Sequence, residues 1–551
     1  MPSDRSTIVR IDAAAACDGL GLSLAPASML LRVRGKARYG AWSGLAGARL
    51  IALGTSTAID RHPDARNAQR ITRLDCVLLP GMVNAHTHLD LTHLGPRPFS
   101  PEGGFVAWAD IIRAGRRTDE QGIKSSVRMG IERSLLAGVV AVADIAGGVG
   151  RRTSTWPLEA MAASPLVGVS YCEYFCIGAQ SESQLADTLA AFARRLRQEG
   201  STPPGASLMQ WTGRRAVRVG LQPHAPYSVG PAGYAAAMGY ARFAGVPVST
   251  HLAESPEEAR LLASADGPFR DLLAAVGVWD AKAQSEFGGE RPIPRWIRMI
   301  GASAGERSGL VAADMRSAAF GGPRIAEIRE ADLFEEESAA IATESAQLSR
   351  LIVAHCNDVA PGEAHLLADV GATVAYCPRS SAYFGHERSF GAHPYRGLLA
   401  EGVEVAIGTD SVVNLPASGG KTGKSGPLLS VLDEIRFLHR RDAADPVALL
   451  HMATIAGARA LGLPTEAFAF GQRLEGDMVV PRAGGESDAS SAEVGEGLPI
   501  AGVVAVPMSA PTKDERSRTP LEVVLGGTAA AELLAVGTES GEDGRAWSAD
   551  P

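Results

Sequence analysis

The sequence is short of positive charge and of long apolar runs. Its 551 residues carry 53 Lys and Arg against 61 Asp and Glu, which gives a formal net charge of −8. A chain without a basic surplus lacks the electrostatic footprint of a nucleic-acid-binding protein, so nucleic acid is not an expected partner. No apolar run reaches the roughly 18 residues that a membrane-spanning helix needs, so a membrane is not an expected partner either.

Cysteine is also scarce, and its positions are scattered. The six cysteines include one close pair, Cys172 and Cys176, with no second pair to complete a zinc knuckle or a disulfide framework. The first residues, MPSDRSTIVR, lack the basic stretch and the apolar core of a signal peptide. These absences favour a reducing compartment and predict a cytoplasmic protein.

What the chain does contain is an alternation of apolar strands with helical patterns. Its length is sufficient for an α/β fold of the (β/α)8 barrel type with a smaller companion domain. Short apolar strands are expected at 82–85, 139–145, 216–221, 246–250, 350–354, 373–376 and 403–407. Buried strands spaced by helices indicate a parallel sheet with crossover helices. Repetition on this scale favours a closed barrel over an open doubly wound sheet.

The predicted domain boundaries follow changes in composition. They are 1–78 and 466–538 for the two parts of a small β-sandwich, 79–465 for the barrel and 539–551 for a tail. Two stretches rich in small and acidic residues, about 303–345 and about 482–493, are interpreted as insertions. Surface decoration is the simplest interpretation of both. The first precedes the strand that bears His355, so a lid over the active site is an alternative hypothesis for it.

The strongest local signal is the motif PGMVNAHTH, which ends at His88. Alternate residues of a strand point to the same face, so His86 and His88 can hold one ion between them. Further ionisable residues follow at or just past the ends of later strands, namely His224, His251, Glu254, His355 and Asp410. In a parallel barrel all the carboxyl ends of the strands converge on one face, where active sites lie. Any one of these residues could be a core histidine or a helix cap, but seven of them at the ends of five strands indicate a metal site.

Together these motifs resemble those of the amidohydrolase superfamily, in its branch of aromatic-amine deaminases and chlorohydrolases. The matching stretches are PGMVNAHTHL, GLQPHAPYSV, THLAES, VAHC, IGTDS, TIAGARALGLP and GQRLEGDMVV. The resemblance implies a TIM barrel with a small β-sandwich built from both ends of the chain. Within the branch, NAHTHLDLT, GPFRDLL and CPRSSAYFGH are similar to aminodeoxyfutalosine deaminases and to S-adenosylhomocysteine and methylthioadenosine deaminases. Many relatives carry Asn where this chain has Ser381.

The resemblance also implies a metal cofactor. One divalent ion would be held by His86, His88, His251 and Asp410, with zinc the first choice and iron the alternative. Many binuclear amidohydrolases bridge two metals with a carboxylated lysine on the fourth barrel strand. This chain has no lysine between Lys124 and Lys282, so that bridge is excluded in its usual form. Glu173 is an alternative bridging group.

Roles for the other residues follow from the same resemblance. His355 and Asp410 would accept and relay the proton of an activated water, and Glu254 would protonate the substrate ring. The candidate substrate contacts are His224, Trp108 and Arg379. Each has a structural alternative: His224 as a brace for its turn, Trp108 as a core aromatic, Arg379 as the partner of an acidic neighbour. Glu254 likewise could simply open a helix.

The function that the resemblance implies is hydrolytic deamination of an aminated heteroaromatic. A 6-aminopurine nucleoside, such as aminodeoxyfutalosine or an adenosine derivative, is the expected small-molecule substrate. A chlorohydrolase and a cyclic amidase share the fold and remain alternatives, and a non-catalytic barrel is a third. A homo-oligomer is compatible with the sequence, which does not fix the oligomeric state.

Overall fold

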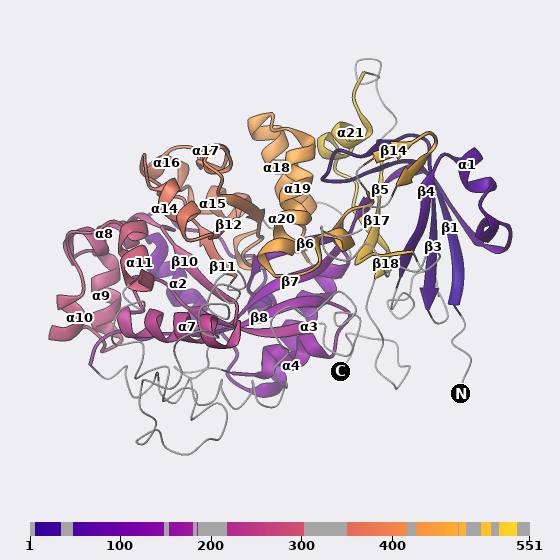
Figure 1. Ribbon diagram of the computed structural model, residues 1–551. Coiled ribbons are helices and arrows are strands. Elements are labelled where there is room, and N and C mark those ends of the chain that lie inside the picture. The colour runs from indigo at the N-terminus through magenta and orange to yellow at the C-terminus, as the bar shows by residue number, and fades with distance from the viewer. Residues whose placement is uncertain are drawn as a thin grey trace, which may run out of the picture.

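The computed structural model describes residues 6–34, 48–147, 154–179, 185, 217–301, 350–415, 426–471, 473–480, 497–508 and 517–536. The stretches that the sequence suggested as insertions, about 303–345 and about 482–493, lie outside these residues, as does the 539–551 tail. The described residues form two β-sheets with helices around one of them (Figure 1).

Eight parallel strands form one sheet in their order along the chain. They are β6 (Met82–Thr87), β7 (Val139–Ala146), β8 (Val167–Tyr174), β9 (Val217–Pro223), β10 (Val248–Leu252), β11 (Leu351–His355), β12 (Thr373–Tyr376) and β13 (Glu404–Ile407). The first and last strands meet where Thr87 pairs with Asp410. The backbone N–H of Asp410 donates to the carbonyl of His86 at 3.0 Å. This contact brings the sheet round into a barrel and confirms the predicted fold class.

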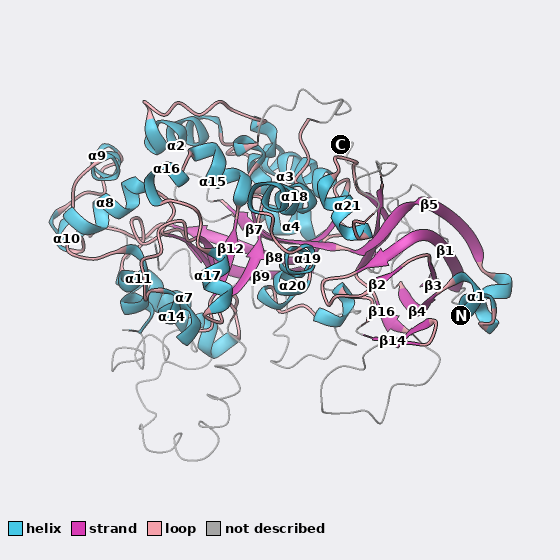
Figure 2. Ribbon diagram, turned by 90° about the horizontal axis from the view of Figure 1, so that it is seen from above, coloured by secondary structure: helices cyan, strands magenta, loops and turns pink. Residues whose placement is uncertain are grey.

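Helices cover the outside of the barrel (Figure 2). They are η2 (Leu89–Leu94), α2 (Gly104–Gly115), α3 (Glu120–Leu135), α4 (Trp156–Ala162), α7 (Pro231–Ala244), α8 (Pro256–Ser264), α9 (Pro268–Ala275), α10 (Ala281–Ser285), α11 (Pro292–Gly301), α14 (Ala364–Asp369), α15 (Pro378–Phe384), α16 (Glu387–Phe390), α17 (Tyr395–Ala400), η5 (Val412–Asn414), α18 (Val431–Asp442), α19 (Pro446–Ala453) and α20 (Ile455–Ala460). Every residue of β6, β7 and β8 is buried, because these strands are covered on both faces. Within the described residues, no helix is both long and apolar enough to cross a membrane.

Helix starts hold the strand ends in place. Helix α8 follows directly on the segment that carries His251 and Glu254. The side chain of Ser255 accepts the backbone N–H of Glu258 at 3.3 Å, and Pro256 occupies the first helical turn. Both features stabilise a helix at its first residue. The chain therefore leaves the barrel at a defined point just past the two candidate site residues.

The second sheet has ten strands drawn from both ends of the chain. They are β1 (Ser6–Cys17), β2 (Ser23–Leu24), β3 (Ala27–Arg34), β4 (Arg49–Gly54), β5 (Gln69–Pro80), β14 (Arg473–Glu475), β15 (Met478–Val480), β16 (Leu498–Pro499), β17 (Gly502–Pro507) and β18 (Glu532–Val536). Four short helices accompany them: α1 (Ser56–Asp60), η1 (Pro63–Asn67), η6 (Thr465–Phe468) and α21 (Pro520–Gly526). Figure 1 shows the yellow strands β17 and β18 beside the indigo strands of the N-terminus.

One glycine joins this sheet to the barrel. Gly81 separates β5 from β6, and its N–H donates to the carbonyl of Gly502 at 2.9 Å. A Cβ at Gly81 would lie 2.6 Å from a methyl group of Val140, so no larger residue fits without displacing the neighbouring strand. The second sheet has its own apolar core, which includes Ile11, Met29 and Phe470.

Candidate active site

His86 and His88 lie at the carboxyl end of β6 with their ring centroids 5.2 Å apart. Both ring nitrogens of His86, and Nδ1 of His88, are buried without a hydrogen-bond partner in the part of the chain that the structure describes. A buried polar atom left without a partner costs about 1–3 kcal/mol. A bound ligand would recover part of this cost.

His251, on β10, faces the same point. Its Nε2 lies 3.4 Å from Nε2 of His88, and its Nδ1 lies 2.9 Å from the backbone oxygen of His224. A carbonyl oxygen can only accept, so Nδ1 carries the proton and Nε2 presents a lone pair. Burial lowers the pKa of His251 to about 4 and, together with the neighbouring histidines, holds the pKa of His86 well below its ordinary value. The rings are thus neutral and available as ligands.

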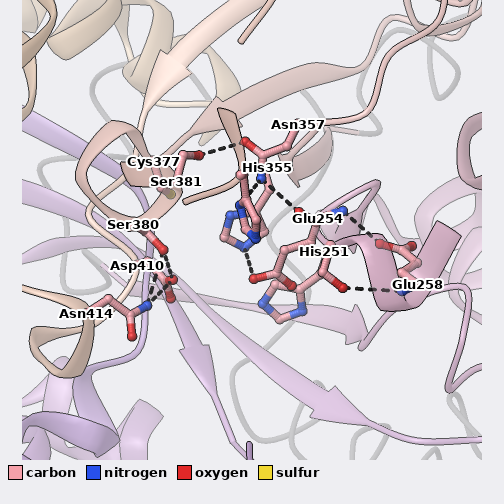
Figure 3. Close-up of polar contacts among 12 residues, drawn as sticks. His251, Glu254, Glu258, His355, Asn357, Cys377, Ser380, Ser381, Asp410 and Asn414 are labelled. Atoms are coloured by element: carbon pink, nitrogen blue, oxygen red, sulfur yellow. Dashed lines mark hydrogen bonds and ion pairs between the residues drawn. The ribbon is translucent and has the colours of Figure 1, made fainter. Parts of the chain in front are cut away.

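Asp410 completes this group from the segment after β13. Its Oδ1 lies 3.7 Å from Nε2 of His88. Its Oδ2 accepts hydrogen bonds from Ser380 at 2.7 Å and from Asn414 at 2.5 Å (Figure 3). Burial raises the pKa of Asp410 to about 6, although the two hydrogen bonds oppose that rise. The arrangement leaves one carboxylate oxygen free to face the histidines.

These residues fit a divalent metal ion. His86, His88 and His251 offer one nitrogen each within 4.8 Å of one another, and Glu254, His355 and Asp410 form a second group of the same kind. Imidazole nitrogens and a carboxylate oxygen are the ligands that zinc and iron bind in proteins. Metal binding needs deprotonated ligands, which the low histidine pKa values supply. The orphaned nitrogens of His86 are the observation that most directly calls for an ion.

Glu254 and His355 form a proton-carrying pair beside this group. Nε2 of His355 lies 3.4 Å from Oε1 of Glu254, and both side chains are buried (Figure 3). Burial, and secondarily the charge of Asp410, raises the pKa of Glu254 well above its ordinary value. Burial lowers the pKa of His355 well below the ordinary value of a histidine. These opposite shifts favour a protonated carboxyl beside an unprotonated imidazole, which pairs a proton donor with a proton acceptor.

The backbone around this pair is held in uncommon conformations. Ala253, His355, Cys356 and Asp410 have φ values of 53°, 73°, 50° and 58°. Non-glycine residues in this region carry strain of about 1–3 kcal/mol each, and such residues cluster at functional sites. In this structure the strained positions are at the ends of three barrel strands, next to the candidate catalytic side chains.

Polar side chains hold that backbone in position. The N–H of Glu254 donates to Glu258 Oε2 at 2.7 Å, and the Glu254 carbonyl accepts from Nδ2 of Asn357 at 3.0 Å. Ser381, the residue that departs from the pattern of many relatives, donates to Oδ1 of Asn357 at 2.6 Å. The serine therefore supports the segment that carries Glu254 through Asn357.

His224 and Trp108 lie at the same end of the barrel. Nδ1 of His224 is 2.7 Å from the hydroxyl of Ser228, and its ring centroid is 4.9 Å from that of His251. Trp108 packs among aromatic side chains, with ring centroids 5.2 Å from Phe105 and 5.0 Å from Phe384. His224 thus contacts a predicted metal ligand, and Trp108 belongs to an aromatic cluster.

Arg379 pairs with an acidic neighbour, which is the structural role that the sequence offered as the alternative to substrate binding. Its Nε donates to Oε1 of the fully buried Glu434 at 2.6 Å, and its backbone N–H donates to the other oxygen at 2.8 Å. A third bond runs from the guanidinium to the carbonyl of Ser430 at 3.1 Å. The guanidinium therefore ties α15 to α18.

Sequence reasoning missed several polar residues at the site. Ser380 lies within the recognised CPRSS motif, and Asn414 follows Asp410 by four residues in SVVNL, but neither was singled out. Arg116, at the end of α2, approaches Glu173 and Asp90, at 3.6 Å and 3.3 Å respectively. No pattern in the sequence marks these contacts, because Arg116 reaches the site from a helix end.

Comparison with known proteins decides the family. The model of the amidohydrolase family matches residues 77–267 and 331–528. The chain belongs to the amidohydrolase family. This confirms the predicted family and the prediction of a hydrolase that acts on carbon–nitrogen bonds other than peptide bonds. The histidine-rich group described above is the candidate metal site expected of this metal-dependent family.

Named relatives of this amidohydrolase are deaminases. It is 26% identical over 437 residues to the aminodeoxyfutalosine deaminase of Deinococcus radiodurans, covering 76% of this chain and 84% of that one. It is 24% identical over 394 residues to the 5-methylthioadenosine/S-adenosylhomocysteine deaminase of Desulfovibrio desulfuricans, covering 70% and 67%. The crystal structure of the Helicobacter pylori aminofutalosine deaminase with methylthio-coformycin has the same fold, with a TM-score of 0.58 at 15% identity, covering 95% and 97%.

The fourth barrel strand of this amidohydrolase is β9, with the sequence VRVGLQP. It contains no lysine, as predicted, so a carboxylated lysine cannot bridge two metals there. Glu173 lies on the third strand, and one of its oxygens lies within 4.8 Å of a nitrogen of His224 and a nitrogen of His251.

Proposed function

We propose that this amidohydrolase is a hydrolytic deaminase of adenosine-like substrates that works with one divalent metal ion. The observation that carries the proposal is the pairing of Glu254 with His355 at 3.4 Å, beside Asp410 and the orphaned histidine nitrogens. The two relatives named for deaminases of adenosine-like compounds support the same substrate class.

The metal ligands in this proposal are His86, His88, His251 and Asp410. Zinc is the first choice and iron the alternative, because both accept three imidazoles and a carboxylate. The bound ion would lower the pKa of a water molecule and so supply the nucleophile at neutral pH.

The protein's own residues would handle the protons. His355 and Asp410 would accept the proton of the attacking water, since both lie in one group with Glu254. Glu254 would donate its proton to the ring nitrogen next to the reacting carbon, which makes that carbon electrophilic. The same residues would then return a proton to the departing ammonia. The buried setting excludes bulk water from these transfers.

Two further side chains would contact the substrate. His224 lies beside His251 and would approach the amino group or the ring. Trp108, with Phe105 and Phe384, would form an apolar wall against the heterocycle. For Arg379, the substrate contact considered from the sequence is less well supported than its pairing with Glu434.

The proposal is tested by ammonia release from zinc-loaded protein across a panel of amines. The panel holds aminodeoxyfutalosine, adenosine, S-adenosylhomocysteine, methylthioadenosine, guanine and cytosine. Glu254→Gln should retain the metal and lose at least about a hundredfold in kcat, the lower end for a general acid or base. Ammonia from none of the amines, or a Glu254→Gln variant near the wild-type rate, would overturn the assignment. Chloride release from a chlorinated heterocycle would then indicate the chlorohydrolase alternative.

A further inference from the structure

Glu173 lies on β8 with its side chain directed to the site. Residues alternate between the two faces of a strand, so Glu173 shares its face with Tyr171 and Val169. The neighbouring Tyr174 belongs to the opposite face, where its hydroxyl donates to the carbonyl of Gly233 on α7 at 2.7 Å. The carboxylate of Glu173 thus lies near the carboxyl end of β8, and one of its oxygens is close to nitrogens of His224 and His251.

Among the residues that the structure describes, only one of the two carboxylate oxygens of Glu173 has a partner. Oε2 lies 3.6 Å from Nη1 of Arg116, whose Nε lies 3.3 Å from Asp90. Oε1 is buried and has no hydrogen-bond partner within the described ranges, and the side chain is 3% exposed. Because Arg116 lies beside Oε2, Oε1 is the oxygen left to accept a hydrogen bond when the group is ionised. Leaving that oxygen without a partner costs free energy, which a donor on a bound substrate would recover.

His224 provides a second acceptor beside it. The hydroxyl of Ser228 lies 3.2 Å from the carbonyl of Ala225, to which it donates, and 2.7 Å from Nδ1 of His224. When the hydroxyl directs its hydrogen at the carbonyl it accepts from the ring, and in that arrangement Nδ1 carries the proton of the neutral imidazole. Nε2 of His224 is then left with its lone pair. One oxygen of Glu173 and one ring nitrogen of His224 lie within 4.8 Å of each other, so the carboxylate and the imidazole lie side by side at the edge of the site.

A second metal ion does not suit this pair. Nε2 of His251 has a single lone pair, and that nitrogen lies 3.4 Å from Nε2 of His88 in the first metal group. Its Nδ1 carries a proton and donates to a carbonyl. The guanidinium of Arg116, at 3.6 Å from Glu173, would also repel a divalent ion. The ligand that two adjacent acceptors fit is a group with two hydrogens on one atom.

We propose that Oε1 of Glu173 and Nε2 of His224 together receive the two hydrogens of a primary amino group on the substrate. Glu173 is then a specificity-determining residue that selects an aminated ring over a halogenated one, with Arg116 as its positioning residue. A site built around a substrate N–H discriminates strongly against analogues that lack it, because its own buried acceptors are then left unpaired. This inference rests on the proposed deaminase function and adds that the site recognises the amino group of the substrate.

The test compares adenosine with 6-chloropurine riboside on zinc-loaded wild type, Glu173→Gln and Glu173→Ala. In Glu173→Gln the amide oxygen faces Arg116, so the amide NH2 replaces the acceptor that faces the substrate. We expect kcat/KM for adenosine to fall about 10- to 100-fold while the value for the chloro compound changes less than about threefold. The metal content should stay at that of wild type. Glu363→Gln is the matched control, since Glu363 is a buried carboxylate paired with an arginine, Arg291, outside the site.

A second readout does not depend on turnover. In the Glu254→Gln background, calorimetry should show tighter binding of adenosine than of purine riboside, which lacks the amino group, and Glu173→Gln should remove that preference. The proposal would be overturned if Glu173→Gln lowered kcat/KM equally for adenosine and for 6-chloropurine riboside. It would also be overturned if Glu173→Gln kept the preference for the amino compound both in kcat/KM and in binding. Loss of a metal equivalent in Glu173→Gln would overturn it in favour of a cation site. Absence of ammonia from every amine with wild type overturns the proposed function instead, and chloride release in that case overturns both.

Discussion

Nδ2 of Asn414 donates to Oδ2 of Asp410 at 2.5 Å, which leaves Oδ1 as the carboxylate oxygen nearest His88. Groups that orient a metal ligand typically contribute 10- to 100-fold to metal affinity. We expect Asn414→Ala to weaken zinc binding by about tenfold or more, measured by competition with a chelator. Ser134→Ala is the control, because Ser134 is also buried but donates within α3. Unchanged affinity in Asn414→Ala would show that Asp410 keeps its orientation without this bond.

Removal of one histidine of the metal group should lower the metal content of the purified protein. His86→Ala deletes a ring whose two nitrogens are both buried without partners among the described residues. We expect less than about a tenth of the wild-type metal by elemental analysis after dialysis, since one of four proposed ligands is lost. His365→Ala, on the exposed surface of α14, should retain full metal. Wild-type metal content in His86→Ala would place the ion elsewhere.

Loss of Arg379 should affect stability more than substrate binding. Arg379→Met leaves the carboxylate of Glu434 buried without its charged partner, although the backbone N–H of residue 379 still donates to it, and loss of one partner of a buried ion pair costs about 3–5 kcal/mol of unfolding free energy. Arg379→Met/Glu434→Gln should recover part of this loss, because the buried charge is removed. Denaturant unfolding and steady-state kinetics on the same samples separate the two roles. A large rise in KM at unchanged stability would instead assign Arg379 to the substrate.

Asp12 gives the second sheet a dependence on pH. Its carboxylate accepts from Ser28 and from Arg70 at 2.5 Å, and from Arg10 at 2.8 Å. Burial alone would raise its pKa, but these hydrogen bonds outweigh burial and lower the pKa below the ordinary value. A lowered folded-state pKa contributes stability above the unfolded pKa near 3.8, and that stability is lost as the pH falls through the folded value.

Asp12→Asn should therefore destabilise the second sheet by about 1–3 kcal/mol at pH 7 and by progressively less below pH 4. Hydrogen exchange of amides in β1 and β3 measures this locally. Asp64→Asn provides the control, since Asp64 has only a partly exposed contact with Arg32 at 3.6 Å. A pH-independent difference between wild type and Asp12→Asn would contradict the argument.

Most of the barrel could be predicted from the sequence because its strands are short apolar runs between helical patterns. Strand β8 was missed, since the polar residues Ser170 and Glu173 interrupt its apolar run. Strand β5 was missed for a different reason. Its first half is largely exposed and polar, and its partner β17 lies at the other end of the chain.

The predicted metal ligands share a simple property: each lies at a strand end within a short motif. His86, His251 and Asp410 could be placed together because a barrel brings strand ends to one face. Asn414 and Arg116 could not be placed at the site from the sequence. Asn414 lies in η5 and Arg116 lies at the end of α2, and the positions of these two helices relative to the strand ends are set only by the tertiary fold. Local motifs thus locate the candidate ligands, whereas the contacts of Asn414 and Arg116 depend on tertiary structure.

The pairing of β5 with β17 has a consequence for synthesis on the ribosome. Strand β5 emerges early, but the residues that pair with it, such as Val503, emerge only after the whole barrel has been translated. Until then one edge of the N-terminal sheet stays open, and open edges invite association with other chains. A message truncated before β17 would yield a product with that edge permanently exposed. Completion of β17 therefore closes that edge of the N-terminal sheet.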